Sequence, residues 1–212
     1  MKEQLQKDFD NIIKNLSLSQ RDTEIKQFYL DNFINKGFPN RRDENWKFSD
    51  LNQIIKKNIG ELSFYNDYTS TNKVDTSVFV DGLEHNKIVF INGRIEKIDF
   101  DYEKKDQIEI IDKSETINKF NNNNSLSDLN NAFTNKSFKI IVKNGYQLVK
   151  PLIIYHITNS DIWSKNINLR LDFELGKDSS LRLIDLYNDT SEKNFLNIFY
   201  NFDLKENAVL KN

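Results

Sequence analysis

The chain of 212 residues is nearly balanced in charge, with 30 lysines and arginines against 32 aspartates and glutamates. A protein whose main partner is nucleic acid needs an excess of basic groups to neutralise phosphates, so this balance argues against that class. The sequence contains no cysteine, which excludes disulfides, thiolate metal ligands and a cysteine nucleophile within this chain.

The N-terminus is charged and carries no apolar segment of the kind found in signal peptides. No run of consecutive apolar residues approaches the ~18 that a membrane-spanning helix needs. We therefore expect a cytoplasmic protein without a membrane partner. Hydrophobic residues make up 38% of the chain, which is enough for a folded core rather than a disordered chain.

Three amphipathic helices are predicted at the start of the chain. Apolar residues recur at helical spacing over residues 2–16, again over 25–33, and once more over 51–59. Ser19 stands at the position of an N-cap before the second helix. We assign residues 1–60 to an N-terminal helical subdomain.

The least generic part of the sequence lies between the second and third helices. Gly37 and Pro39 end the second helix, and Ser49 is a candidate to begin the third. The basic and aromatic residues between them resemble a patch that stacks and clamps single-stranded nucleic acid, but interleaved carboxylates cancel the charge. A structural role is favoured, in which Trp46 and Phe48 fill a joint between helices and sheet while the arginines pair with carboxylates or cap carbonyls.

The middle of the chain changes from a polar segment to β-structure. Residues 61–86 are polar and irregular, and we assign them to a linker with at most one strand near residues 78–80. Apolar residues flank Asn92-Gly93, which is the strongest short sequence pattern for a β-hairpin. Residues 87–212 are therefore assigned to a β-strand region.

Two further elements are predicted inside that region. Residues 108–111 form a candidate strand, and residues 126–133 a short helix with Ser125 as its N-cap. Later segments alternate apolar and polar residues with a period of two, which is typical of strands with one buried face.

A pattern of strand end, polar turn, small residue and new strand recurs at residues 142–148, 175–181 and 204–210, with offsets of 33 (175 minus 142) and 29 (204 minus 175). Such a period is typical of a solenoid, so a β-helix is the leading architecture and an antiparallel sandwich the alternative. A new strand begins near Leu210 without a visible cap, so we expect the β-helix to be truncated at residue 212, in the N-terminal portion of a longer protein.

Few residues carry a pattern of catalytic chemistry. His85 and His156 lack neighbours at metal-ligand spacing, and His156 is expected to be a hydrogen-bonded strand residue. Asp172 and Glu174 share the polar face of a strand and are expected to be solvated. With six glycines in total, neither nucleotide-binding glycine pattern occurs. We predict no catalytic, cofactor-binding or metal-binding residue in this chain, and no enzyme activity.

Four segments resemble, in order, the motifs of one known family. They are Gly37-Phe38-Pro39-Asn40-Arg41-Arg42-Asp43-Glu44-Asn45-Trp46-Lys47-Phe48-Ser49-Asp50-Leu51, Phe90-Ile91-Asn92-Gly93-Arg94, Leu129-Asn130-Asn131-Ala132-Phe133 and Lys150-Pro151-Leu152-Ile153-Ile154-Tyr155-His156. They are similar to G-[LF]-P-T-x-R-x-E-x-W-[KR]-[YF]-T-x-L, F-V-N-G-x, L-N-x-A-F and K-P-I-x-I-x-H of the SufD family, scaffold subunits of the SUF iron–sulfur cluster assembly system.

Asn40 and Ser49 depart from this pattern, since the family often has Thr at both positions. The residues of the resemblance to which we give a structural role are Gly37, Pro39, Arg41, Arg42, Glu44, Trp46, Leu51, Asn92, Gly93 and Pro151.

The resemblance implies a mainly β protein with N-terminal α-helices, in which a right-handed parallel β-helix (solenoid) follows the helical subdomain. It implies a SufB-like subunit and a SufC-like ATPase as partners, in a complex with a transient iron–sulfur cluster. The chain has about half the family's length. The helices with which the family docks SufC, its contact with SufB and its histidine discussed as a cluster or iron ligand would therefore lie beyond Asn212. His156 is not that histidine. The alternatives are a polysaccharide-acting β-helix enzyme of the secreted type and a stand-alone interaction solenoid.

Overall fold

The computed structural model describes residues 2–16, 18–64, 76–113, 124–159, 162–189 and 193–212. The helices are α1 (Lys2–Asn15), α2 (Gln20–Lys36), α3 (Leu51–Asn58) and α4 (Ser125–Phe133), with 3-10 turns η1 (Glu44–Trp46) and η2 (Thr76–Val78). The strands are β1 (Asn86–Ile91), β2 (Arg94–Asp99), β3 (Ile108–Lys113), β4 (Ser137–Val142), β5 (Leu152–Thr158), β6 (Lys165–Leu175), β7 (Ser180–Asp189), β8 (Asn194–Leu204) and β9 (Val209–Lys211).

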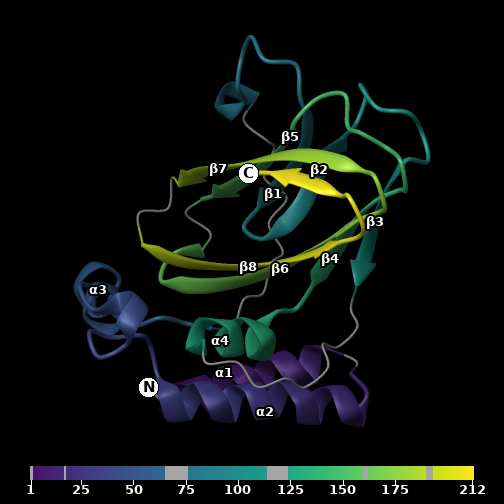
Figure 1. Cartoon of the computed structure of the whole chain (residues 1–212). Coiled ribbons are helices and arrows are strands. Elements are labelled where there is room, and N and C mark those ends of the chain that lie inside the picture. The colour runs from purple at the N-terminus through teal and green to yellow at the C-terminus, as the bar shows by residue number, and fades with distance from the viewer. Residues whose placement is uncertain (1, 17, 65–75, 114–123, 160–161, 190–192) are drawn as a thin grey trace.

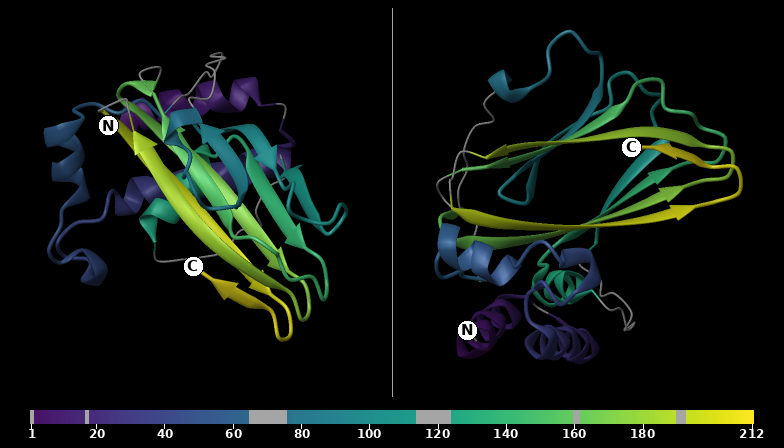
Figure 2. Two further views of the ribbon diagram at one scale, coloured as in Figure 1. Left: turned by 90° about the horizontal axis from the view of Figure 1, so that it is seen from above. Right: turned by 60° about the vertical axis from the view of Figure 1, so that its left-hand side comes forward.

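The strands form two sheets that face each other (Figures 1 and 2). One has the order β2-β1-β5-β7-β9 and the other β3-β4-β6-β8. The pairs β1–β2 and β3–β4 are antiparallel, whereas the remaining pairs in both sheets are parallel. From β5 onward, each strand lies in the sheet opposite to that of the strand before it.

A hydrophobic core fills the space between the sheets. The period of two places every second side chain of each strand in this core, as the sequence alternation predicts. One sheet contributes Ile88, Phe90, Leu152, Ile154, Leu181 and Leu183, and the other contributes Phe138, Ile140, Val142, Leu169, Leu171, Phe173 and Leu175.

A helical layer covers the outer face of the four-stranded sheet (Figure 1). Helix α4 lies between α2 and strands β6 and β8, and its Leu129 and Phe133 belong to the helical core. The Asn130 side chain donates to the carbonyl oxygens of Leu169 on β6 at 3.0 Å and Asn197 on β8 at 2.8 Å. One amide group thereby joins the helix to two strands, which explains an asparagine in the middle of a buried helix.

The predicted fold class is wrong. The chain is not a mainly β protein with a right-handed parallel β-helix (solenoid) behind a helical subdomain, because both sheets are mixed and α4 lies between β3 and β4 along the chain. The fold is α/β, with four α-helices in the described part of the chain. The Asn92-Gly93 turn makes β2 antiparallel to β1. The second antiparallel pair is β3–β4, whose strands are separated along the chain by α4.

The sequence repeat nevertheless corresponds to a physical feature, since its polar turns lie against one another. The Asn144 side chain accepts from the Lys177 amide at 2.9 Å, and the Asn207 side chain donates to Asp178 at 2.8 Å. The repeat therefore marks equivalent turns between parallel neighbours. It could not reveal the antiparallel pairs that precede them, because those pairs lie largely outside the repeating segments.

Most predicted helices and strands are confirmed, with shifted caps. Ser19 does cap α2, accepting from the Asp22 amide at 3.1 Å. The cap of α3 is Asp50 rather than Ser49, and the cap of α4 is Asn124 rather than Ser125. In both cases a carboxylate or amide oxygen one position away accepts the free amide hydrogen bonds.

The segment between the helices and β1 differs in detail from its prediction. Turn η2 ends at Val78, and no strand covers residues 78–80. Residues 65–75 of the predicted linker 61–86 lie outside the described part of the chain. The division into 1–60, 61–86 and 87–212 stays a prediction, although Leu62 and Phe64 pack into the helical core. None of the helices in the described ranges is long and apolar enough to cross a membrane.

Candidate functional site

The first motif, residues 37–51, joins α2 to α3, and its Phe38 contacts Phe195 of β8 edge-on at 5.9 Å between ring centroids. Gly37 ends α2 with a positive φ of 71°, and its amide donates to the Phe33 carbonyl at 2.7 Å. Phe38 is buried and contacts Phe33 edge-on at 5.1 Å between ring centroids. The Pro39 carbonyl accepts from the Leu51 amide at 3.0 Å, which closes the segment as a loop.

The charged half of this motif does not have the role that the sequence predicted. Arg41, Arg42 and Glu44 are exposed, and neither guanidinium has a hydrogen bond or ion pair with any residue in the described ranges. Trp46 is half-buried against the helical core, as expected for a joint, but Phe48 is 85% exposed. The predicted filling of the joint by Phe48 is therefore wrong, and the arginines have no predicted partner within the described ranges.

The second and fourth motifs are placed side by side by strands β1 and β5. Asn92 and Asn159 exchange hydrogen bonds, from Asn92 Nδ2 to Asn159 Oδ1 at 2.8 Å and from the Asn159 amide to Asn92 Oδ1 at 3.1 Å. A Cβ on Gly93 would stand 2.8 Å from the Ile167 side chain, so the turn requires glycine for space as well as for its φ of 80°. The Pro151 carbonyl accepts from the Asn86 amide at 2.9 Å. These contacts hold the turn and the two strands together.

An apolar pocket of about 380 Å³ borders strand β8. Trp46 and Leu51 of the first motif line it from the helical side, together with Leu126, Tyr187, Phe195, Leu196, Asn197 and Ile198. Strand β8 is an edge strand of its sheet, and among the described residues it pairs only with β6. The pocket thus lies beside a strand edge whose outer backbone groups have no sheet partner in the described part of the chain.

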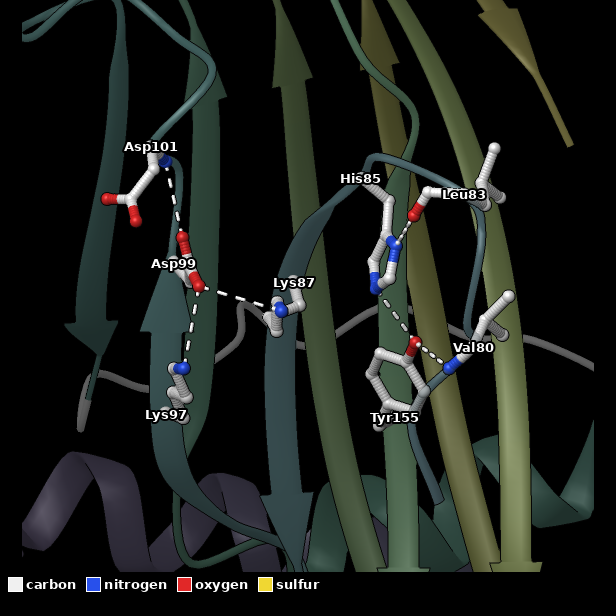
Figure 3. A network of polar contacts seen from close by, with 8 residues as sticks. All are labelled: Val80, Leu83, His85, Lys87, Lys97, Asp99, Asp101 and Tyr155. Atoms are coloured by element: carbon white, nitrogen blue, oxygen red, sulfur yellow. Dashed lines mark hydrogen bonds and ion pairs between the residues drawn. The ribbon is translucent and has the colours of Figure 1, made fainter. Parts of the chain in front are cut away.

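A polar network on the outer face of the five-stranded sheet includes the first histidine (Figure 3). His85 Nδ1 lies 2.6 Å from the Leu83 carbonyl oxygen, which only accepts, so Nδ1 carries the proton and donates. The Tyr155 hydroxyl donates to His85 Nε2 at 2.8 Å and accepts from the Val80 amide at 3.1 Å. Each hydrogen bond in this outer network therefore has a defined donor and acceptor. Two of the partners, the Leu83 carbonyl and the Val80 amide, are backbone groups.

A second outer group joins β1 to β2 (Figure 3). Asp99 lies 3.6 Å from the Lys87 ammonium and 3.5 Å from that of Lys97, and it accepts from the Asp101 amide at 3.2 Å. Burial alone would raise the pKa of the Asp99 carboxyl, but this amide and the two ammonium groups outweigh it and lower the pKa. The group ties the first hairpin together.

The second histidine belongs to a cluster inside the molecule, between the two sheets. His156 on β5 is buried, and its Nε2 lies 3.2 Å from Asp185 Oδ1 on β7 and 3.0 Å from the Tyr200 hydroxyl on β8. The Tyr200 hydroxyl donates in a short hydrogen bond to Asp185. The prediction that His156 is a hydrogen-bonded strand residue is confirmed, but its partners were not foreseen.

Aromatic rings enclose this cluster. Phe90, His156 and Tyr187 are register neighbours across β1, β5 and β7. Their rings stack in a row, with centroid distances of 5.5 Å and 5.0 Å on either side of the imidazole. Burial, reinforced by the Asp185 charge, raises the pKa values of Tyr187 and Tyr200. We name His156, Asp185, Tyr187 and Tyr200 the inner cluster.

The alternation of the strands contained a partial signal for the inner cluster. Asp185 and Tyr187 lie two and four residues after the core residue Leu183, and Tyr200 two residues before Phe202, so each shares an inward face. A polar residue in such a position needs a partner, and that requirement pointed to an internal polar group. The sequence did not show which strands face each other, and therefore not which residues meet.

Within the described ranges, no three side chains of histidine, cysteine, aspartate or glutamate gather in the manner of a common metal site. The inner cluster has only one histidine and one aspartate, and its other polar groups are phenols. No known family model matches the chain, and a search of curated proteins finds no match. The resemblance to SufD thus depends on the four sequence motifs.

Proposed function

We propose that the chain is a SufD-like, non-catalytic scaffold subunit in iron–sulfur cluster assembly, acting with a SufB-like subunit and a SufC-like ATPase. The support is the order and spacing of four motifs along nearly the whole chain. In this proposal the partners are proteins rather than nucleic acid or membrane, the place of action is the cytoplasm, and any cluster is carried transiently by the complex.

The observation that carries a scaffold role is the pocket beside β8. An edge strand of Asn194–Leu204 offers a row of backbone donors and acceptors to another strand. The adjacent pocket is lined mainly by apolar side chains, and such a surface suits a peptide segment better than a small polar substrate. The proposal takes this surface as a contact for another polypeptide of the assembly.

The exposed half of the first motif fits the same function. Arg41, Arg42 and Phe48 are exposed near the pocket residue Trp46 without contributing to the core. Exposed arginines and aromatic residues are enriched where proteins bind each other. The polysaccharide-acting alternative depended on a β-helix, and the mixed sheets remove that basis.

The test is affinity purification of the tagged protein from its native host. We expect homologues of SufB and SufC to co-purify, and their joint absence would overturn the proposal. Leu196→Glu places a charge in the pocket, and we expect it to reduce the yield of these partners. Leu204→Glu makes the same change on the same strand at an exposed position outside the pocket, and it should leave the yield unchanged.

Equal yields for the two variants would separate the two parts of the proposal. They would remove the pocket from the contact surface, while co-purification itself would still support the scaffold role. Loss of both partners in both variants would instead indicate damage to the fold, which circular dichroism of each purified variant detects.

A further inference from the structure

A second pocket lies where β7 and β9 begin, and its lining is polar, unlike that of the pocket beside β8. Its volume of about 360 Å³ lies within the range of sites for small molecules. The polar residues that line it include Gln147, Asp178, Ser179, Arg182, Asn207 and Lys211. Two cations, one carboxylate and neutral polar side chains therefore border one hollow.

The two cations stand side by side. Arg182 on β7 and Lys211 on β9 are register partners in a parallel pair. The preceding partners, Leu181 and Leu210, pack in the core between the sheets, so the two cations lie on the outer face. Neighbouring strands are about 4.8 Å apart, and like charges on register partners repel each other. Neither cation forms an ion pair with a carboxylate in the described ranges, and the Arg182 guanidinium donates to the Val149 carbonyl at 3.4 Å.

The adjoining turns show the opposite arrangement, because their stacked side chains are complementary. Lys177 Nζ lies 2.7 Å from Glu206 Oε2, and Asn207 Nδ2 donates to Asp178 Oδ1 at 2.8 Å. The row of two cations is like-charged, so an anion between them would neutralise a repulsion that the stacked side chains leave in place.

A buried hydroxyl in the same pocket also lacks a partner. Ser179 is 1% exposed, and its Oγ accepts and donates no hydrogen bond among the described residues. The Ser179 amide donates to the Gly176 carbonyl at 3.2 Å, and in the next turn the Ala208 amide donates to the Lys205 carbonyl at 3.0 Å. Since alanine serves at the equivalent place, the turn requires a small residue but no hydroxyl. A buried hydroxyl without a partner costs free energy, which a ligand in the pocket would recover.

The chemistry of the donors selects a class of ligand. An arginine guanidinium offers a planar fork that binds two oxygens of a phosphate, and a lysine ammonium adds a point charge. A phosphate monoester carries a charge of about −1.5 to −2 at pH 7, which matches two cations better than the single charge of a carboxylate does. The sequence has no glycine-rich phosphate loop, so recognition in this pocket depends on side chains.

We infer that Arg182, Lys211 and Ser179 bind the phosphate group of a small molecule that carries a phosphate monoester. The two cations and the Ser179 hydroxyl donate to the phosphate oxygens. Asp178 and Gln147 line the same pocket and suit hydroxyl groups in the rest of the ligand. Binding is non-covalent, and no bond is formed or broken. The inference goes beyond the sequence, from which no ligand-binding residue was expected.

The site does not depend on the proposed scaffold function. Its argument uses the register, charge and burial of side chains at the start of β7 and β9, on the outer face of the five-stranded sheet. The two proposals therefore fail separately, because co-purification tests partners, whereas a ligand titration of the purified chain tests the pocket.

The experiment is isothermal titration calorimetry of the purified chain, in phosphate-free buffer at constant ionic strength, with glycerol 3-phosphate, inorganic phosphate and glycerol as probes. We expect glycerol 3-phosphate to saturate one site per chain and to bind more tightly than inorganic phosphate, and glycerol not to bind. Arg182→Gln and Lys211→Gln should each weaken glycerol 3-phosphate binding by about tenfold, because each removes a charged donor to the phosphate.

Lys56→Gln is the matched control, since Lys56 is an exposed lysine on α3 outside the pocket. This variant should keep the affinity of the unaltered chain. The inference would be overturned by the absence of saturable glycerol 3-phosphate binding, by tighter binding of inorganic phosphate, or by an affinity that survives in both the Arg182 and Lys211 variants. An equal loss in the Lys56 variant would also contradict it, because binding would then follow net charge rather than the pocket.

Ser179→Ala tests the hydroxyl separately. In the ligand-free chain it should leave the urea unfolding midpoint unchanged, because the hydroxyl has no partner to lose among the described residues. It should nevertheless weaken glycerol 3-phosphate binding several-fold. A lower midpoint without ligand, or an unchanged affinity, would show that Ser179 does not bind the phosphate.

Discussion

Tyr155 and His156 are neighbours on β5, yet they point to opposite faces of the sheet and enter two different polar groups. In the outer network, the Tyr155 hydroxyl links His85 Nε2 to the Val80 amide, and His85 donates to a backbone carbonyl. In the inner cluster, the His156 imidazole has side-chain partners alone within the described residues, namely Asp185 and Tyr200. The first group fixes the chain through backbone partners, whereas the second joins side chains of three strands to one another.

Glu103 resembles the outer network, because it also binds backbone groups, but it makes more hydrogen bonds. Its carboxylate accepts four hydrogen bonds: from Asn86 Nδ2 at 2.6 Å, the Tyr146 hydroxyl at 2.6 Å, and the amides of Val149 and Lys150 at 3.1 Å each. Burial alone would raise the pKa of this carboxyl, but the hydrogen bonds outweigh it and hold the pKa below its ordinary value of 4.5. Loss of this charged acceptor should therefore have the largest effect.

Glu103→Gln is expected to lower the free energy of unfolding by about 2 kcal/mol, because the amide NH₂ faces hydrogen-bond donors that the carboxylate had satisfied. Since the folded pKa is lowered, the carboxylate's contribution is present above pH 4.5 and is lost as the pH falls through the folded pKa. Urea unfolding at a series of pH values measures both effects, and the difference from the unaltered chain should shrink in acid.

Glu109→Gln is the control for this prediction, because Glu109 is an exposed glutamate on β3. Its unfolding free energy should change by less than about 0.5 kcal/mol. A Glu103 variant as stable as this control would show that the four hydrogen bonds do not hold the loops together.

Tyr155→Phe should have the next largest effect. The phenyl ring keeps its edge-on contact with Phe79 at 4.9 Å, so the change removes only the hydroxyl. The Val80 amide and His85 Nε2 then lose their partner, and we expect a cost of about 1–2 kcal/mol in urea unfolding. A cost near zero would mean that the outer network does not fix the segment before β1, and the contrast with the inner cluster would disappear.

The sequence predicted the local elements better than the way in which they meet. Asn92-Gly93 specified its hairpin because positive φ at both turn residues is a local requirement. The identity of neighbouring strands is not local, since β5 pairs with β1 and β7 across intervening segments of the other sheet. The architecture was therefore assigned wrongly, although the elements themselves were mostly placed.

The same limit explains what was found and missed in the candidate sites. Asn130 was part of a recognised motif, yet its role depends on the carbonyls of Leu169 and Asn197, which lie on two other strands. His156 was judged structural because sequence spacing offered no ligand neighbours. Its neighbours come from β7 and β8, so only the folded chain brings an aspartate and two tyrosines to it.

Tyr200→Phe should have the smallest effect on stability of the three substitutions. The hydroxyl donates to Asp185 and contacts His156, but no backbone group in the described ranges depends on it. His156 and Asp185 keep each other as partners in the variant, so we expect a change below about 1 kcal/mol in unfolding free energy. A loss in urea unfolding as large as that of Tyr155→Phe would instead place Tyr200 with Tyr155 among the groups that hold the fold.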